Sequence, residues 1–378
     1  MLNRYLRQPA QLDLKEKMLI IGGPRQVGKT TFALSFLNPS EKTHPAYYNW
    51  DIERRRKEVL NAEFPTGQAL IVLDEIHKYS RWRNLVKGFY DESYPRRNFL
   101  ITGSARLDHY RKGGDSLLGR YHYQRLHPFS LLELNPEPSM DDISALLMSG
   151  GFPEPLLKGS ERFARRWRSE RATRVVREDL RDLEHVKDIS LIELLLDALP
   201  ARVGSPLSVR SLQEDLKVAH ESVSRWLELL ENVYLTYRIL PYGSPKIRAV
   251  RKEQKLYFWD WAAVEDKGAR FENMLASHLL KYCHYLEDTE GFKMELRFIR
   301  DKERREVDFV VIKDKKPVFA VECKTGEKSP AKHLRYFADR TPIPLFYQVH
   351  LGTRDYESAD GRIRVLPFAS FLKAIMAP

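Results

Sequence analysis

The chain has 378 residues, of which 43% are hydrophobic, and a formal net charge of +11 at pH 7. This length exceeds one compact core, so we expect two or three domains, and no apolar stretch approaches the length of a membrane span. The only two cysteines, Cys283 and Cys323, exclude a disulfide framework and favour a cytoplasmic setting. The positive charge favours an acidic partner, with nucleic acid first among the candidates.

The first informative segment is residues 17–32, which read KMLIIGGPRQVGKTTF. An apolar strand runs into a glycine loop that matches G-x-x-x-x-G-K-[ST], the phosphate-binding loop of ATPases and GTPases. The glycines let backbone N–H groups surround phosphate oxygens at the start of a helix. A lysine at this position reaches the β- and γ-phosphates, and a threonine hydroxyl ligates Mg²⁺. The predicted nucleotide-binding residues are Gly23, Gly28, Lys29, Thr30 and Thr31.

The next elements alternate in the manner of an α/β domain. We predict a strand over residues 46–50, a basic helix from Ile52, and a strand in ALIVLDE over residues 69–75. Because ligands bind at the carboxyl ends of parallel strands, Asp74 and Glu75 are expected to emerge at the phosphate site. Asp74 would hold Mg²⁺ and Glu75 would polarise the attacking water. The alternative is a buried strand that ends in solvated acids.

Two further residues are candidates for catalysis. A strand over residues 99–102 is followed by Ser104, at the position of a residue that senses hydrolysis beside the γ-phosphate in additional-strand ATPases. Thr-Gly-Ser is also an ordinary turn sequence. Arg120 follows the core and is a candidate to stabilise charge on the transferred phosphoryl group, within the subunit or in a neighbouring one. The alternative for Arg120 is a surface charge.

The middle of the chain is predicted to be helical. Residues 162–185 read as one long helix with an arginine-rich face, which could lie along a phosphate backbone or pair with nearby acids. Residues 189–239 then predict three short helices, and residues 239–258 a β-hairpin, which is the winged-helix order. The third helix would bury Val223, Leu227 and Leu230 and leave His220, Ser224 and Arg225 outward for DNA. The wing would add Lys246, Arg248, Arg251 and Lys252 as phosphate contacts. Such modules also dock proteins.

The C-terminal region contains a hairpin with charges at one end. Residues 306–326 read EVDFVVIKDKKPVFAVECKTG, two strands around a turn at residues 314–316. If the hairpin is symmetric about Lys315, Asp308 lies opposite Glu322, and alternation places Lys324 on the same face. Such a D…E-x-K constellation is the metal site of PD-(D/E)xK nucleases, in which the carboxylates bind Mg²⁺ and the lysine activates water. Glu272, on the preceding helix, is the further acid of that predicted set. The alternative is a structural charge cluster.

As a set, the motifs of this chain resemble a widespread family of prokaryotic AAA-type ATPases with a C-terminal region of unknown function. The matching stretches are GPRQVGKTT, VLDEIH, FLITGSA, LLGRY, HPFSLLEL, GGFPE, VVREDL, KLYFWDWA, FEN, EVDFVV and VECKTG. In that family the C-terminal region looks like a winged helix followed by a PD-(D/E)xK-like domain. The resemblance assigns Gly23, Gly28, Lys29, Thr30, Asp74, Glu75, Ser104 and Arg120 to the nucleotide, and Glu272, Asp308, Glu322 and Lys324 to the nuclease-like site. Ala105 departs from the family, which commonly has a second serine there.

The predicted fold class is α/β, with four parts along the chain. They are an AAA+-like P-loop core with a parallel sheet over residues 1–130, a helical lid or linker over 131–187, a winged-helix module over 188–254, and a PD-(D/E)xK nuclease-like α/β domain over 255–378. The leading hypothesis is an enzyme that binds and hydrolyses ATP with Mg²⁺ and acts on DNA as a switch or machine, with possible self-association and no membrane contact. The alternatives are an ATP-gated protein-interaction switch and an ATP-regulated, Mg²⁺-dependent nuclease.

Overall fold

The computed structural model describes residues 3–103, 117–180, 188–243 and 254–376. The chain divides into two compact units, Met1–Pro128 with Asn232–Tyr234, and Phe129–Glu231 with Leu235–Pro378. Within the described ranges, no helix combines the length and the apolar character needed to cross a membrane. The predicted sensor Ser104 and the predicted wing residues Lys246, Arg248, Arg251 and Lys252 lie outside the described residues.

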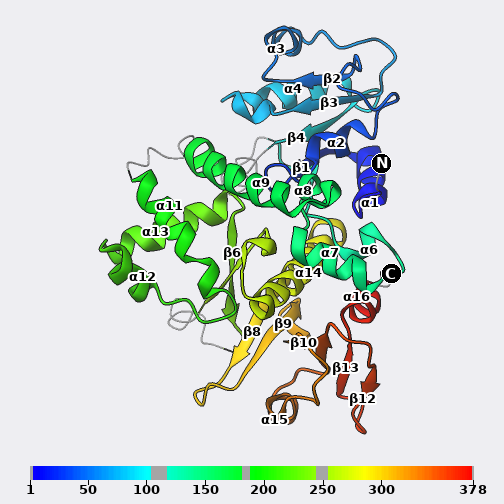
Figure 1. Cartoon of the computed structure of the whole chain (residues 1–378). Coiled ribbons are helices and arrows are strands. Elements are labelled where there is room, and N and C mark those ends of the chain that lie inside the picture. The colour runs from blue at the N-terminus through cyan, green and yellow to red at the C-terminus, as the bar shows by residue number, and fades with distance from the viewer. Residues whose placement is uncertain (1–2, 104–116, 181–187, 244–253, 377–378) are drawn as a thin grey trace. The chain divides into compact units, whose positions relative to one another are not determined.

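The N-terminal unit is built on a parallel sheet. Its described helices are α1 (Arg7–Glu16), α2 (Lys29–Leu34), α3 (Glu53–Leu60), η1 (Ile76–Lys78) and α4 (Trp82–Ser93), and its strands are β1 (Met18–Gly22), β2 (Tyr47–Asn49), β3 (Leu70–Asp74), β4 (Asn98–Thr102) and β5 (Tyr121–Arg125). The strands lie in the order β2-β3-β4-β1-β5, and each neighbouring pair is parallel (Figure 1). Strands β1 and β4 are buried at every position, as near-continuous apolar runs predict for a parallel sheet covered on both faces. The predicted strand–helix alternation is confirmed.

The strand register of this sheet decides which residues meet at its carboxyl edge. Asn49 pairs with Asp74, and Asp74 pairs with Thr102 on the next strand. Strand β4 lies between β3 and β1, the strand that leads into the glycine loop. Residues far apart in the sequence therefore come together beside the loop.

The second unit begins with helices. Those described before its sheet are α6 (Leu131–Leu134), α7 (Met140–Ser149), α8 (Pro153–Lys158), α9 (Glu161–Arg174), the π-helical turn η2 (Val175–Asp179), α11 (Ile189–Ala198), η3 (Pro200–Arg202), α12 (Val209–Leu216) and α13 (His220–Asn232). The predicted long helix begins where expected, because the Ser160 hydroxyl caps α9 by accepting from the Phe163 N–H. On its basic face Arg165 pairs with Glu161, and Arg177 pairs with Glu193 at 2.7 Å. These contacts favour pairing with acids for this face.

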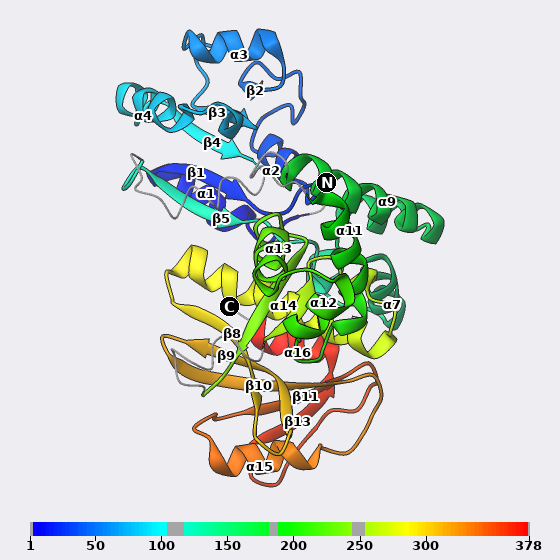
Figure 2. The same ribbon diagram turned by 90° about the vertical axis from the view of Figure 1, so that its left-hand side faces the viewer.

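A large mixed sheet forms the rest of the second unit. Its strands are β6 (Thr236–Pro241), β7 (Lys255–Phe258), β8 (Met294–Arg300), β9 (Glu306–Lys313), β10 (Lys316–Lys324), β11 (Phe346–His350), β12 (Tyr356–Glu357) and β13 (Ile363–Pro367), and the further helices are η4 (Trp261–Ala263), α14 (Lys267–Glu290), α15 (Lys332–Arg340) and α16 (Phe368–Met376). The described strands lie in the order β12-β13-β11-β10-β9-β8-β6-β7. Figure 2 shows α14 and α16 on one side of this sheet and α15 on the other. The core on the α15 side includes Val310, Ala320, Leu334 and Phe337, each almost fully buried.

The predicted order of three helices and a β-hairpin is confirmed by α11, α12, α13 and the antiparallel pair β6–β7. On α13, Val223, Leu227 and Leu230 are buried and His220 and Arg225 are exposed, as predicted, whereas Ser224, also predicted to face outward, is half-buried. The hairpin does not stand apart, because β6 also pairs with β8 and so extends the C-terminal sheet. The predicted boundary between residues 254 and 255 therefore falls within one continuous sheet.

Candidate functional site

The glycine loop joins β1 to α2 with the backbone geometry that its sequence predicts. Gly23 has φ of 124° and Gly28 has φ of 97°, in the left-handed region that favours glycine. A Cβ atom on Gly23 would lie 2.4 Å from the Leu126 carbonyl oxygen, so a larger residue does not fit. Helix α2 begins at Lys29, directly after Gly28. The loop therefore ends at a helix N-terminus, where backbone N–H groups favour an anion.

The side chain of Lys29 folds back across the loop. Its ammonium group donates to the carbonyl oxygens of Gly23 at 2.9 Å and Pro24 at 2.7 Å, and the residue is buried. These contacts hold the positive charge within the loop. A phosphate group bound by the loop would lie next to this ammonium group.

Asp74 is the centre of a hydroxyl cluster at the carboxyl edge of the sheet. Its Oδ2 accepts from the Thr30 hydroxyl at 2.9 Å and from the Tyr47 hydroxyl at 2.6 Å. Its Oδ1 accepts from the Thr102 hydroxyl. The structure thus brings together the predicted Mg²⁺ ligands Thr30 and Asp74, from α2 and β3. Threonine hydroxyl and carboxylate oxygens are the donors that Mg²⁺ prefers.

Two members of this cluster, Tyr47 and Thr102, were not predicted from the sequence as site residues. Both lie on strands that neighbour β3, and neither belongs to a recognisable motif. The sequence did offer one indication for Thr102. It ends its strand as Asp74 does, and strand ends align in a parallel sheet. The contact of Tyr47 depends on the placement of β2 beside β3, which the sequence does not specify.

Glu75 follows Asp74 in a left-handed backbone conformation, with φ of 60°. Burial, and then the charge of Asp74, raise the pKa of Glu75, and the charge of Lys29 opposes this rise. Lys78 lies 3.6 Å from its carboxylate. A carboxylate whose pKa is raised in a cleft is better suited to accept a proton from water.

Two other predicted nucleotide residues, Thr31 and Arg120, are not brought to this cluster. Thr31 is on α2 with an exposed side chain, and Ser104 lies outside the described residues. Arg120 precedes β5, and its carbonyl accepts from Met18 at the start of β1. It is therefore separated from the loop by the length of β1, about 15 Å at about 3.3 Å per residue. Arg120 pairs with Asp91 at 2.6 Å, and the structure does not bring it to the loop of its own chain.

The second predicted site lies in the C-terminal sheet, and its hairpin register agrees with the prediction. Lys316 pairs with Lys313 at the turn, and an irregularity between Pro317 and Phe319 then shifts the pairing by one residue. Val321 consequently pairs with Phe309, so the next residues, Glu322 and Asp308, follow in the predicted alignment. The Asp308 Oδ2 accepts from the Cys323 N–H at 2.9 Å.

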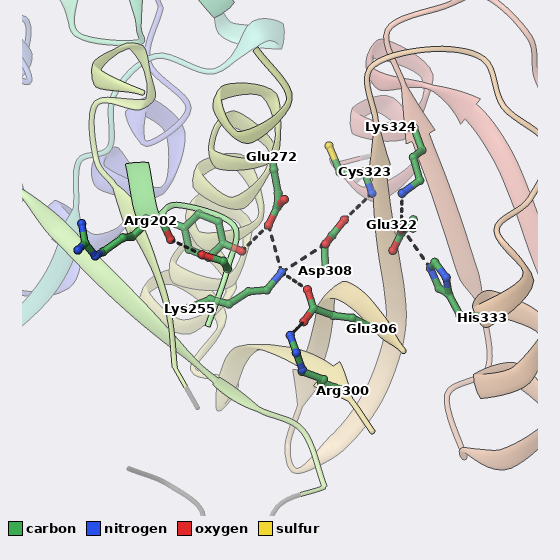
Figure 3. Close-up of polar contacts among 12 residues, drawn as sticks. Arg202, Lys255, Glu272, Arg300, Glu306, Asp308, Glu322, Cys323, Lys324 and His333 are labelled. Atoms are coloured by element: carbon green, nitrogen blue, oxygen red, sulfur yellow. Dashed lines mark hydrogen bonds and ion pairs between the residues drawn. The ribbon is translucent and has the colours of Figure 1, made fainter. Parts of the chain in front are cut away.

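A buried lysine lies among the acids at this end of the sheet. The Lys255 ammonium group is 2.6 Å from Glu306 Oε1, 3.2 Å from Glu272 Oε1 and 3.3 Å from Asp308 Oδ1 (Figure 3). Burial alone would lower the pKa of Lys255, but the charges of Asp308, Glu272 and Glu306 outweigh it and raise this pKa. Burial, and then the charge of Asp308, raise the pKa of Glu272 to about 8. The Tyr257 hydroxyl also donates to Glu272 at 2.8 Å.

Glu322 and Lys324 form a separate set of contacts. Lys324 donates to Glu322 Oε1 at 2.5 Å, and His333 Nε2 lies 3.2 Å from the same oxygen (Figure 3). Glu322 Oε2 is buried with no hydrogen-bond partner among the described residues. Within those residues, no group of three or more His, Cys, Asp or Glu side chains is arranged to hold a metal ion. The structure therefore brings Glu272 to Asp308 through Lys255, and Lys324 to Glu322.

Three protein families match successive parts of the chain. Residues 15–135 match the family described as AAA domain. Residues 140–264 match a domain of unknown function (DUF8612), and residues 267–371 match a second one (DUF4143). The predicted AAA-type P-loop fold, followed by a C-terminal region of unknown function, is confirmed.

Two similar proteins align with most of the chain. An uncharacterized protein of Methanocaldococcus jannaschii is 21% identical over 359 residues, which are 86% of this chain and 78% of that protein. An uncharacterized protein of Haemophilus influenzae is 22% identical over 341 residues, with 82% and 83% covered. Among solved structures, the Holliday junction branch migration motor RuvB of Thermotoga maritima is 15% identical, with 62% of this chain and 88% of that chain covered. The TM-score of this superposition is 0.27.

Proposed function

We propose that the AAA domain binds ATP with Mg²⁺ and hydrolyses it. The observation that carries this proposal is the hydrogen bond between Thr30 and Asp74, at 2.9 Å, beside the glycine loop. The residues that would hold Mg²⁺ are already in contact, and the ammonium group of Lys29 lies within the loop. Bound Mg²⁺ would neutralise phosphate charge.

The roles of the chain's own residues follow from their positions. The backbone N–H groups of the loop and Lys29 would bind phosphate oxygens. Tyr47 and Thr102 orient Asp74 through their hydroxyl groups. Glu75, with its raised pKa, would accept a proton from the attacking water.

Two substitutions test binding and hydrolysis separately. The Lys29→Ala variant should lose most of its affinity for a fluorescent ATP analogue, by at least tenfold, because one charge-assisted contact is worth about 1.5–3 kcal/mol. The Glu75→Gln variant should retain this affinity and lose phosphate release. The exposed Lys57→Ala variant, on α3, serves as the matched control. ATP affinity that survives in Lys29→Ala would refute the nucleotide site, and normal turnover in Glu75→Gln would refute the role of Glu75.

We also propose that the second unit contacts DNA through α13, which would make the protein a DNA-associated switch or machine. The proposal is supported by the order of three helices and a hairpin, and by the position of His220 and Arg225 on the exposed face of α13. The net charge of +11 favours the same partner. Affinity for duplex DNA should fall steeply with salt and should weaken further in the Arg225→Glu variant.

The outcome of this test distinguishes the rival function. The Glu228→Gln variant, which changes an exposed acid on the same helix, is the matched control for the folding of α13. DNA binding that is absent at low salt, together with a protein that co-purifies at equal stoichiometry, would favour an ATP-gated protein-interaction switch. Stimulation of ATP turnover by one form of DNA would support the DNA-associated function.

A further inference from the structure

Two of the acids predicted to form a nuclease-like metal centre, Glu272 and Asp308, already surround a cation together with Glu306, which was not predicted. Glu272 lies on α14, Glu306 and Asp308 lie on β9, and each has one carboxylate oxygen within 3.3 Å of the Lys255 ammonium group. We propose that Lys255 permanently occupies the cation position of this centre, which is therefore a metal-independent ionic core and does not bind Mg²⁺. This inference does not rest on the proposed binding of ATP or DNA.

The residues present do not fit a magnesium ion. Mg²⁺ requires near-octahedral oxygen ligands at about 2.0–2.1 Å and usually keeps several waters. Lys255 has 0% of its side chain exposed, so no open position is available for those waters beside it. The ammonium group instead has three donors for three acceptors, which matches the three surrounding carboxylates.

The other oxygens of Glu306 and Asp308 are engaged as well. Glu306 Oε2 accepts from Arg300 at 2.9 Å, and Asp308 Oδ2 accepts from the backbone N–H of Cys323. The Tyr257 hydroxyl donates to the same Glu272 oxygen that faces Lys255. A metal ion at this position would have to displace the lysine, and a buried charge left without its partner is costly.

This arrangement gives the lysine a definite structural role. Lys255 is the first residue of β7, and its partners lie on α14 and β9. The ammonium group thus connects the hairpin strand β7 to the sheet and to the helix that covers it. Without it, several acids would face one another in the protein interior. A chain that lacks this ammonium group should therefore acquire affinity for a divalent cation at the same place.

The competing possibility is a cation held by Asp308 and Glu322, since Glu322 Oε2 is buried without a hydrogen-bond partner among the described residues. Titration of the full chain with Mn²⁺, in the absence of nucleotide, separates the two. We expect the wild-type chain and its Asp308→Asn and Glu322→Gln variants to bind the same number of Mn²⁺ ions by electron paramagnetic resonance. An ion that is present in wild type and lost in either variant would overturn the proposal.

The reciprocal experiment removes the lysine. The Lys255→Ala variant should gain one Mn²⁺ ion, and the Lys255→Ala/Asp308→Asn double variant should lose it again. A folded Lys255→Ala chain that gains no ion would contradict the proposal. If this variant does not fold, Lys255→Met retains the side-chain length, and its melting temperature should rise with added Mn²⁺ more than that of wild type. Equal shifts in the two chains would also contradict it. ATP affinity, measured on the same samples, reports separately on the proposed function.

Discussion

Replacement of Asn273 with alanine should destabilise the second unit by about 1.5–5.5 kcal/mol. Asn273 is fully buried on α14. Its Oδ1 accepts from the Phe258 N–H at 2.8 Å, and its Nδ2 donates to the Phe258 carbonyl at 2.8 Å. Phe258 is the last residue of β7, the edge strand of the sheet. The carboxamide thus satisfies backbone groups that a further strand would otherwise pair.

The magnitude follows from these two contacts. Alanine leaves one buried N–H and one buried C=O without a partner, at about 1–3 kcal/mol for each group. The better helix propensity of alanine offsets about 0.5 kcal/mol of this cost. Urea unfolding followed by tryptophan fluorescence measures the difference, because Trp259 and Trp261 are buried next to Phe258 in the sequence.

The matched control is Ser277→Ala, one helical turn along α14. Its hydroxyl is 3.2 Å from the Tyr237 hydroxyl and accepts from Asn273 Nδ2 at 3.4 Å, two long neutral contacts that leave no backbone group unpaired when lost, so we expect a loss of about 1 kcal/mol. If Asn273→Ala unfolds within about 0.5 kcal/mol of wild type, the two backbone groups of Phe258 do not depend on this side chain, and the reasoning is refuted.

Three other predictions concern the hydroxyl cluster at Asp74, a buried histidine and a buried ion pair. Tyr47→Phe removes a hydroxyl that orients Asp74, so ATP turnover should require about 10- to 100-fold more Mg²⁺; an unchanged Mg²⁺ dependence would show that the remaining hydroxyls suffice. Burial lowers the pKa of His278 to about 4, so the folded chain stays neutral there while the unfolded chain gains a proton. The unfolding free energy should consequently fall from about pH 6.5 towards pH 4, by at most about 1.4 kcal/mol per pH unit, and less steeply in His278→Gln. Equal slopes in urea titrations of the two proteins would count against this. Lys281→Met leaves the buried Glu133 without its ammonium partner and should cost about 3–5 kcal/mol in thermal or urea unfolding. Adding Glu133→Gln should recover part of that loss, and no recovery would contradict the pairing argument.

Local sequence patterns determined the elements around both candidate sites. The apolar runs before the glycine loop and before Asp74 predicted β1 and β3, because strands buried on both faces need apolar residues at every position. The hairpin at residues 306–326 was predicted with the correct alignment of Asp308 and Glu322, although the pairing at the turn differs by one residue and an irregularity between Pro317 and Phe319 restores the predicted register. The glycines at 23 and 28 were identified through the backbone conformation that the loop requires.

Only the tertiary structure decided which side chains meet. The hydroxyl groups of Tyr47 and Thr102 reach Asp74 because β2 and β4 are its neighbours in the sheet, and strand order is not a local property. The order of the motifs assigned Arg120 to the nucleotide. Because β5 runs parallel to β1 and Arg120 precedes β5, this residue lies at the end of β1 that is opposite the phosphate loop. Lys255 is an ordinary basic residue at the start of a strand in the sequence. It becomes the cation of the carboxylate cluster because the packing of β7 against α14 and β9 removes it from water among three acids.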